Sequence, residues 1–214
     1  GVDELSERVA GAGGWKEVGF TGKSALSAVD DKAAPQRVLK ITEVGTTGMY
    51  GPWLLDKSKM YLALITVGYT LKQDGAGGSF GQGKAGLVRA SLTRTVVAYS
   101  CFEERPEDPG VTRRLLGVNY WKPHDFDGQP HTGWGRFGDQ ATESTSPFTD
   151  EAADEVARSL GIEPRDPSRA EDLGTTFLLL EPIVDPNELL RAIERNWWPA
   201  LVDGDGFDAT VVDY

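Results

Sequence analysis

A glycine-rich stretch at residues 75–86 constrains the fold of this chain more than any other feature. It reads GAGGSFGQGKAG, so six of its twelve residues are glycine, and Lys84 follows the last closely spaced pair. Glycine adopts positive φ at no steric cost, so such a run turns tightly and directs several backbone N–H groups into one concavity. Concavities of this kind bind phosphate groups, and the stretch therefore predicts an anion site.

The stretch is the middle one of three glycine-bearing segments. Residues 41–51 read ITEVGTTGMYG and follow an apolar run, and residues 174–182 read GTTFLLLEP, a strand that opens on a glycine and two threonines. Each segment alone has an ordinary interpretation as a linker, a strand-ending turn or a strand boundary. The three in this order form a narrower pattern that favours a nucleotide site.

Composition narrows the class of protein. With 214 residues, 39% of them hydrophobic and none of the apolar runs long enough for a bilayer, the chain reads as a soluble globular protein that does not cross a membrane. The start lacks a signal peptide and the single Cys101 cannot form an internal disulfide, so a cytoplasmic location is expected. The net charge of −11 makes nucleic-acid binding through this segment an unfavourable hypothesis.

The spacing of apolar residues predicts strands and helices in alternation. Strands are expected at residues 37–43, 94–102, 114–121 and 175–180, and helices at 60–71, 84–92, 149–160 and from 186 onward. The polar, glycine- and proline-rich residues 122–147 are expected to form a loop. The predicted class is α+β, with a mixed, mostly antiparallel sheet.

In its three glycine-bearing segments the sequence resembles the conserved motifs, called boxes, of the GHKL ATPases. This superfamily comprises gyrase, heat-shock chaperone, histidine kinase and mismatch-repair ATPases. Residues 41–49 look like the second box, in which an acidic residue reads the adenine amino group and glycines and a methionine form the pocket wall. Residues 78–86 look like the third box, whose amides hold the triphosphate, and residues 173–178 resemble the strand that contacts the adenine side. The GTTG and GSxGxGK boxes and a later NWWP segment are similar to those of bacterial ATP-binding proteins of this group. The resemblance implies that the nucleotide is bound by Glu43, Gly45, Gly48, Met49, Gly78, Gly81, Gln82, Gly83, Lys84, Thr175 and Thr176.

The resemblance also implies an architecture and a ligand. It predicts a two-layer α/β sandwich of the GHKL (Bergerat) type over residues 1–185, the start of a transducer-like domain at 186–214, and ATP with Mg²⁺ as ligands. No Glu-x-x-x-Asn box occurs in the chain. In the family this box supplies the catalytic glutamate and the Mg²⁺ ligand, so neither is identified here. We therefore expect a nucleotide-sensing domain of a larger bacterial protein that self-associates, with hydrolysis dependent on residues outside the chain.

Two alternatives stay open. Residues 78–84 also fit G-x-x-x-x-G-K, the start of a P-loop, although Ala85 stands where that motif needs Ser or Thr. The chain could also be a catalytically silent scaffold or interaction domain that kept the fold and lost the chemistry.

Several residues that could bind a metal or a ligand are assigned structural roles instead. His124 and His131 match no familiar metal spacing, so no metal site is predicted from them. Trp197 shares a predicted helix face with Leu190, which favours core packing or a domain contact for the tryptophans at 197 and 198. Cys101 is expected to be a small buried hydrophobe.

Overall fold

The computed structural model describes residues 7, 9–20, 35–54, 57–66, 82–141, 144–203 and 208–213. The chain divides into two compact units, Gly1–Pro182 and Ile183–Tyr214. The first unit contains the sheet and all of the described candidate site residues.

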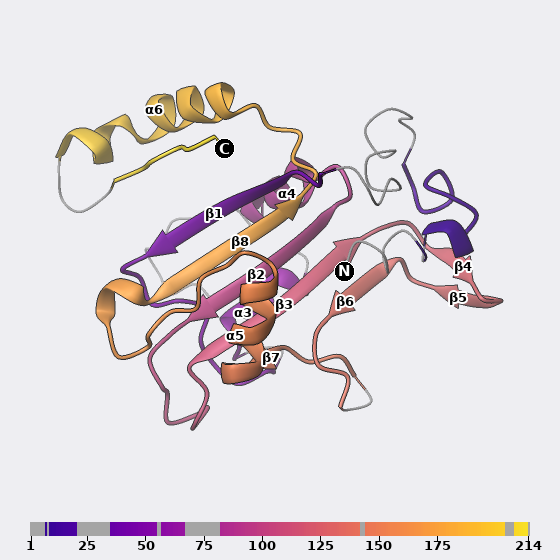
Figure 1. Ribbon diagram of the computed structural model, residues 1–214, viewed down its shortest axis with the longest axis horizontal. Coiled ribbons are helices and arrows are strands. Elements are labelled where there is room, and N and C mark those ends of the chain that lie inside the picture. The colour runs from indigo at the N-terminus through magenta and orange to yellow at the C-terminus, as the bar shows by residue number, and fades with distance from the viewer. Residues whose placement is uncertain are drawn as a thin grey trace. The chain divides into compact units, whose positions relative to one another are not determined.

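A six-stranded sheet is the centre of the first unit (Figure 1). Five strands follow the order β1-β8-β2-β3-β6, and β7 pairs with β3 beside β6. Their bounds are β1 Val38–Val44, β8 Gly174–Leu180, β2 Thr95–Cys101, β3 Arg113–Tyr120, β6 Trp134–Phe137 and β7 Phe148–Thr149. The four long strands begin and end within one residue of their predicted bounds, which confirms the α+β class.

Every pairing between described strands is antiparallel. The predicted antiparallel pair of 94–102 with 114–121 is confirmed as β2 with β3. A doubly wound P-loop fold needs parallel strands, and the described part of this sheet contains none. The sheet topology therefore gives the P-loop alternative no support.

Helices cover both faces of the sheet, so the two-layer expectation is wrong. Strand side chains alternate between faces. Val96 and Ala98 of β2 pack with α3 (Lys59–Leu64) and α4 (Gln82–Ala90), whereas Val97 and Tyr99 pack with α5 (Asp150–Ser159). In Figure 1, α5 lies in front of the sheet and α3 and α4 lie behind it. Apolar residues on both faces of β2 and β8 require this double cover, since every β2 residue after Thr95 is buried.

The predicted loop at 122–147 contains three strands, which corrects the sequence interpretation. β4 (His124–Phe126) and β5 (Gln129–His131) form a hairpin, and β6 follows. The hairpin turn is Asp127-Gly128, and both residues have positive φ, 50° and 72°. Asp-Gly at a two-residue hairpin turn is a strong sequence signal, so this hairpin was predictable from the turn.

The second unit contains the long helix α6 (Pro186–Asp203), as predicted. Asp185 begins it, because its Oδ1 accepts hydrogen bonds from the amides of Asn187 (2.9 Å) and Glu188 (3.1 Å). Trp197 and Trp198 are exposed, so of the two expected roles core packing is wrong, and a domain contact stays a prediction. Within the described residues, no helix has the length and apolar character needed to cross a bilayer.

Burial raises the pKa of three groups, Cys101, Tyr99 and Tyr120, and makes the stability of the first unit sensitive to alkaline pH. Burial raises the pKa of Cys101 from 9.0 to about 11, and that of Tyr120 from 10.0 to about 12. The unfolded chain therefore loses these protons at lower pH than the folded chain. The contribution of these protonated groups to the free energy of unfolding is complete below about pH 9. It is lost as the pH rises toward 11 to 12.

We predict that Cys101→Ala flattens this loss between pH 8 and 10.5, because Cys101 has the lowest unfolded pKa of the three groups, Cys101, Tyr99 and Tyr120. The measurement is the free energy of unfolding in urea at several pH values. The slope of the free energy of unfolding against pH is compared between the parent and the variant. The absolute values are not compared, because the substitution also lowers stability at every pH by leaving a cavity. Equal slopes for parent and variant would contradict the assignment of this pH dependence to Cys101.

Candidate functional site

The predicted adenine-side residues meet at one end of the sheet. β8 lies between β1 and β2, so Glu43 is directly opposite Thr175, and Thr175 is directly opposite Ser100. Residues opposite each other in antiparallel strands share a face. These three therefore form a polar row across β1, β8 and β2, on the face covered by α3. Glu43 is exposed at the sheet edge, whereas Thr175 and Ser100 are buried.

Ser100 connects the polar row to the turn that follows β1. Its hydroxyl accepts a hydrogen bond from the Met49 amide (2.7 Å), donates to the Gly174 carbonyl (3.2 Å), and lies 3.0 Å from the Thr175 hydroxyl. One hydroxyl proton and two lone pairs satisfy all three contacts if Thr175 donates. Nothing in the sequence points to this role of Ser100 beyond its place in an apolar strand.

The two glycines of the turn have different surroundings. Both have positive φ, 69° at Gly45 and 62° at Gly48. A Cβ at Gly45 would have no atom of the described residues within 4 Å, whereas one at Gly48 would clash with the Cys101 carbonyl oxygen. Gly48 thus allows the turn to lie against β2, and Gly45 leaves open space beside Glu43. Met49 is buried, and its side chain packs in the core with Met60 and Leu64.

Thr176 lies on the opposite face from Glu43 and Thr175. It is opposite Thr42, and the two hydroxyls are 3.3 Å apart. Arg165 donates to the Thr176 hydroxyl and to the Glu43 carbonyl oxygen, the latter at 3.0 Å. Thr175 is therefore the threonine that shares a face with the Glu43 side chain. Sequence reasoning missed Arg165, because it lies in an irregular segment brought to β1 only by tertiary structure.

A buried hydrogen-bond network supports Arg165 from the α5 side. The Tyr99 hydroxyl donates to Asp154 Oδ1 (2.8 Å) and accepts from the Arg165 amide (3.2 Å). Asp154 Oδ2 also pairs with Arg113 Nε at 3.0 Å. Burial lowers the pKa of Arg165 and raises that of Tyr99. The neutral phenol and the carboxylate acceptor therefore fix the segment that carries Arg165 against the sheet.

The phosphate-side predictions fall partly outside the described residues. Gly78 and Gly81 lie in the part of the chain that is not described, and no placement is assigned to them. Gln82, Gly83 and Lys84 form the first turn of α4, a nine-residue helix. The first amides of a helix lack intrahelical partners.

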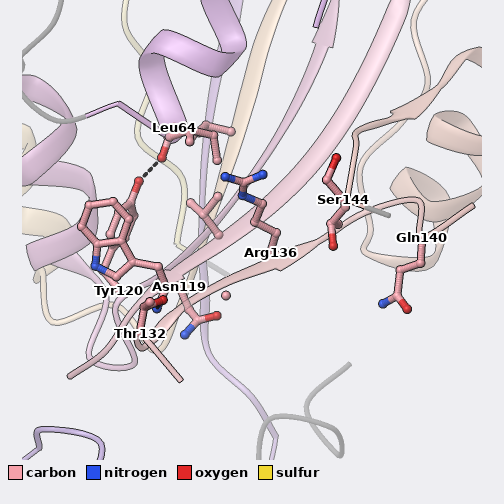
Figure 2. Close-up of a pocket in the computed structure, with 12 residues that line it drawn as sticks. Leu64, Asn119, Tyr120, Thr132, Arg136, Gln140 and Ser144 are labelled. Carbon is pink, nitrogen blue, oxygen red and sulfur yellow. Dashed lines mark hydrogen bonds between the residues drawn. The ribbon is translucent and has the colours of Figure 1, made fainter. Parts of the chain in front are cut away.

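A cavity of about 520 Å³ lies at the other side of the same face, beside the end of α3 (Figure 2). Its floor and rim come from β3 and β6, and none of the predicted nucleotide-binding residues that the structure describes lines it. The described residues that line it are Leu64, Ile65, Val118, Asn119, Tyr120, Thr132, Trp134, Gly135, Arg136, Gln140, Ser144 and Thr145.

His124 and His131 face each other across the β4–β5 hairpin. Their rings stack with centroids 5.8 Å apart. Among the described residues, no group of three or more His, Cys, Asp or Glu side chains could hold a metal ion.

Comparison with protein-family models, with curated proteins and with solved structures found no match to this chain.

The two turn glycines supply a matched pair of variants. We predict that Gly45→Ala costs about 1 kcal/mol, because only the positive φ is unfavourable for alanine. Gly48→Ala is expected to cost about 3 kcal/mol, since the new methyl group also clashes with the β2 backbone. Urea denaturation of the two variants checks this difference. Equal losses would show that the turn does not lie against β2.

Proposed function

We propose that this chain is the ATP-binding, nucleotide-sensing part of a larger bacterial GHKL-type ATPase that works in the cytoplasm. The observation that carries the proposal is the polar row Glu43–Thr175–Ser100. The family resemblance assigns the second box and the Gly-Thr strand to the same side of the adenine. Their adjacency in β1 and β8 supports that assignment, because these segments are far apart in the sequence.

The chemistry of the row suits an adenine ring. The Glu43 carboxylate is exposed and accepts hydrogen bonds, as it does from the Thr46 hydroxyl. A carboxylate in this place would accept from the exocyclic amino group of adenine. The open space next to Gly45 would let a flat ring approach the backbone, since no side chain of the described residues occupies it.

The phosphate and metal requirements are met only in part. The first turn of α4 would hold phosphate oxygens through its first amides, and Lys84 would add a positive charge. The described residues contain no cluster of acidic side chains that could bind Mg²⁺. The proposal therefore includes nucleotide binding by this chain, and leaves water activation and the Mg²⁺ ligand to residues outside it.

We predict that the chain binds ATP more tightly than GTP, because guanine offers a carbonyl oxygen where adenine offers the amino group. Glu43→Ala should weaken ATP binding about tenfold, the value of one hydrogen bond to a charged group. Glu155→Ala, which removes an exposed glutamate from α5, is the matched control and should leave affinity unchanged. Isothermal titration calorimetry measures both.

The other outcomes of this titration discriminate among the alternatives. ATP affinity that survives Glu43→Ala but is lost in Lys84→Ala would favour the P-loop hypothesis. Absence of heat with every nucleotide, also for an N-terminally extended protein, would favour the scaffold hypothesis.

We further predict that the 214-residue chain binds ATP without turning it over, whereas a longer protein with a Glu-x-x-x-Asn helix hydrolyses it. Such a protein should also self-associate when ATP is added. Steady-state phosphate release and light scattering after gel filtration measure the two properties. Equal turnover by both proteins would mean that the catalytic carboxylate lies within this chain.

A further inference from the structure

The cavity between α3, β3 and β6 supplies a second binding site, distinct from the proposed nucleotide site. We propose that it binds a small planar organic anion, a ring that carries a carboxylate or a comparable acidic group. Its volume, about 520 Å³, lies within the range of about 300 to 1,000 Å³ typical of small-molecule sites. The inference does not rest on the proposed function, because none of the described residues assigned to the nucleotide lines this cavity.

Aromatic side chains form one wall of the cavity. Tyr120 and Trp134 are opposite each other in β3 and β6, so both side chains lie on the α3 face. Their rings meet edge to face, with centroids 5.7 Å apart. The Tyr120 hydroxyl donates to the Leu64 carbonyl oxygen, which holds the phenol ring against the end of α3. Trp134 is 55% exposed and offers a flat apolar surface to a ligand ring.

Arg136 gives the cavity its charge preference. It is opposite Val118 in the pairing of β6 with β3, which places it on the same face as Tyr120 and Trp134. It is the one charged residue among the described residues of the lining, and no ion pair involves it in the described part of the chain. In Figure 2 its guanidinium group projects between Tyr120 and Ser144. A guanidinium group binds carboxylates through paired N–H donors.

Polar groups complete the side of the cavity opposite the aromatic wall. Gln140, Ser144 and Thr145 contribute an amide and two hydroxyl groups to the lining. Together with Arg136 they offer donors to the acidic end of a ligand whose ring lies on Trp134. In a chain of net charge −11, a cavity in which the only charge among the described lining residues is positive favours anions over cations.

The test compares 2-naphthoate with 2-naphthamide, its uncharged isostere, by isothermal titration calorimetry on the full 214-residue chain. The parent should bind the naphthoate more tightly. Arg136→Gln should weaken naphthoate binding about tenfold and leave naphthamide binding unchanged, because only the charge-assisted pair is lost. Trp134→Ala should weaken both ligands. Arg158→Gln, on α5 across the sheet, is the matched control and should change neither.

Two controls keep the result interpretable. Arg136 and Trp134 are exposed, so both variants should keep the parent circular-dichroism spectrum and thermal transition. Saturating ATP should leave naphthoate affinity unchanged if the sites are separate. Absence of naphthoate binding, equal binding by the parent and Arg136→Gln, or displacement of naphthoate by ATP would each overturn the proposal.

Discussion

The insertion of β8 between β1 and β2 is the constraint on which the rest of the first unit depends. The two strands beside β8 come from far earlier in the chain, and β8 pairs with both over nearly its full length. Gly174 makes the start of this pairing possible, since a side chain there would clash with the Glu43 carbonyl oxygen. Until β8 is in place, neither core cluster is complete, because Leu179 belongs to one and Leu178 to the other.

Insertion of β8 also creates two polar rows, one on each face of the sheet. Glu43, Thr175 and Ser100 share the α3 face, whereas Thr42, Thr176 and Tyr99 share the α5 face. We propose that the first row binds a ligand. In the second row, Thr176 accepts a hydrogen bond from Arg165 and Tyr99 donates one to Asp154. The α5 row thus stabilises the first row, because Arg165 donates a hydrogen bond to the Glu43 carbonyl oxygen.

The α3 face carries exposed groups of opposite charge at its two sides. At the β1 side an exposed carboxylate stands next to open backbone, and at the β3–β6 side an exposed guanidinium group stands next to aromatic rings. The first arrangement suits a hydrogen-bond donor such as an amino group, and the second suits an acid. Two sites that differ in this way can act on different ligands while sharing one sheet.

The sequence by itself determined the local elements. Alternation of apolar residues located the four long strands, and glycine located the turn after β1, because side-chain periodicity and backbone conformation are encoded in neighbouring residues. The resemblance named Glu43 and Thr175 but treated Thr175 and Thr176 as equivalent. Only the tertiary structure separated them, since strand register decides which face each occupies. It also decided the places of α5, Ser100 and Arg165, because these depend on contacts between segments far apart in the chain, which no local pattern encodes.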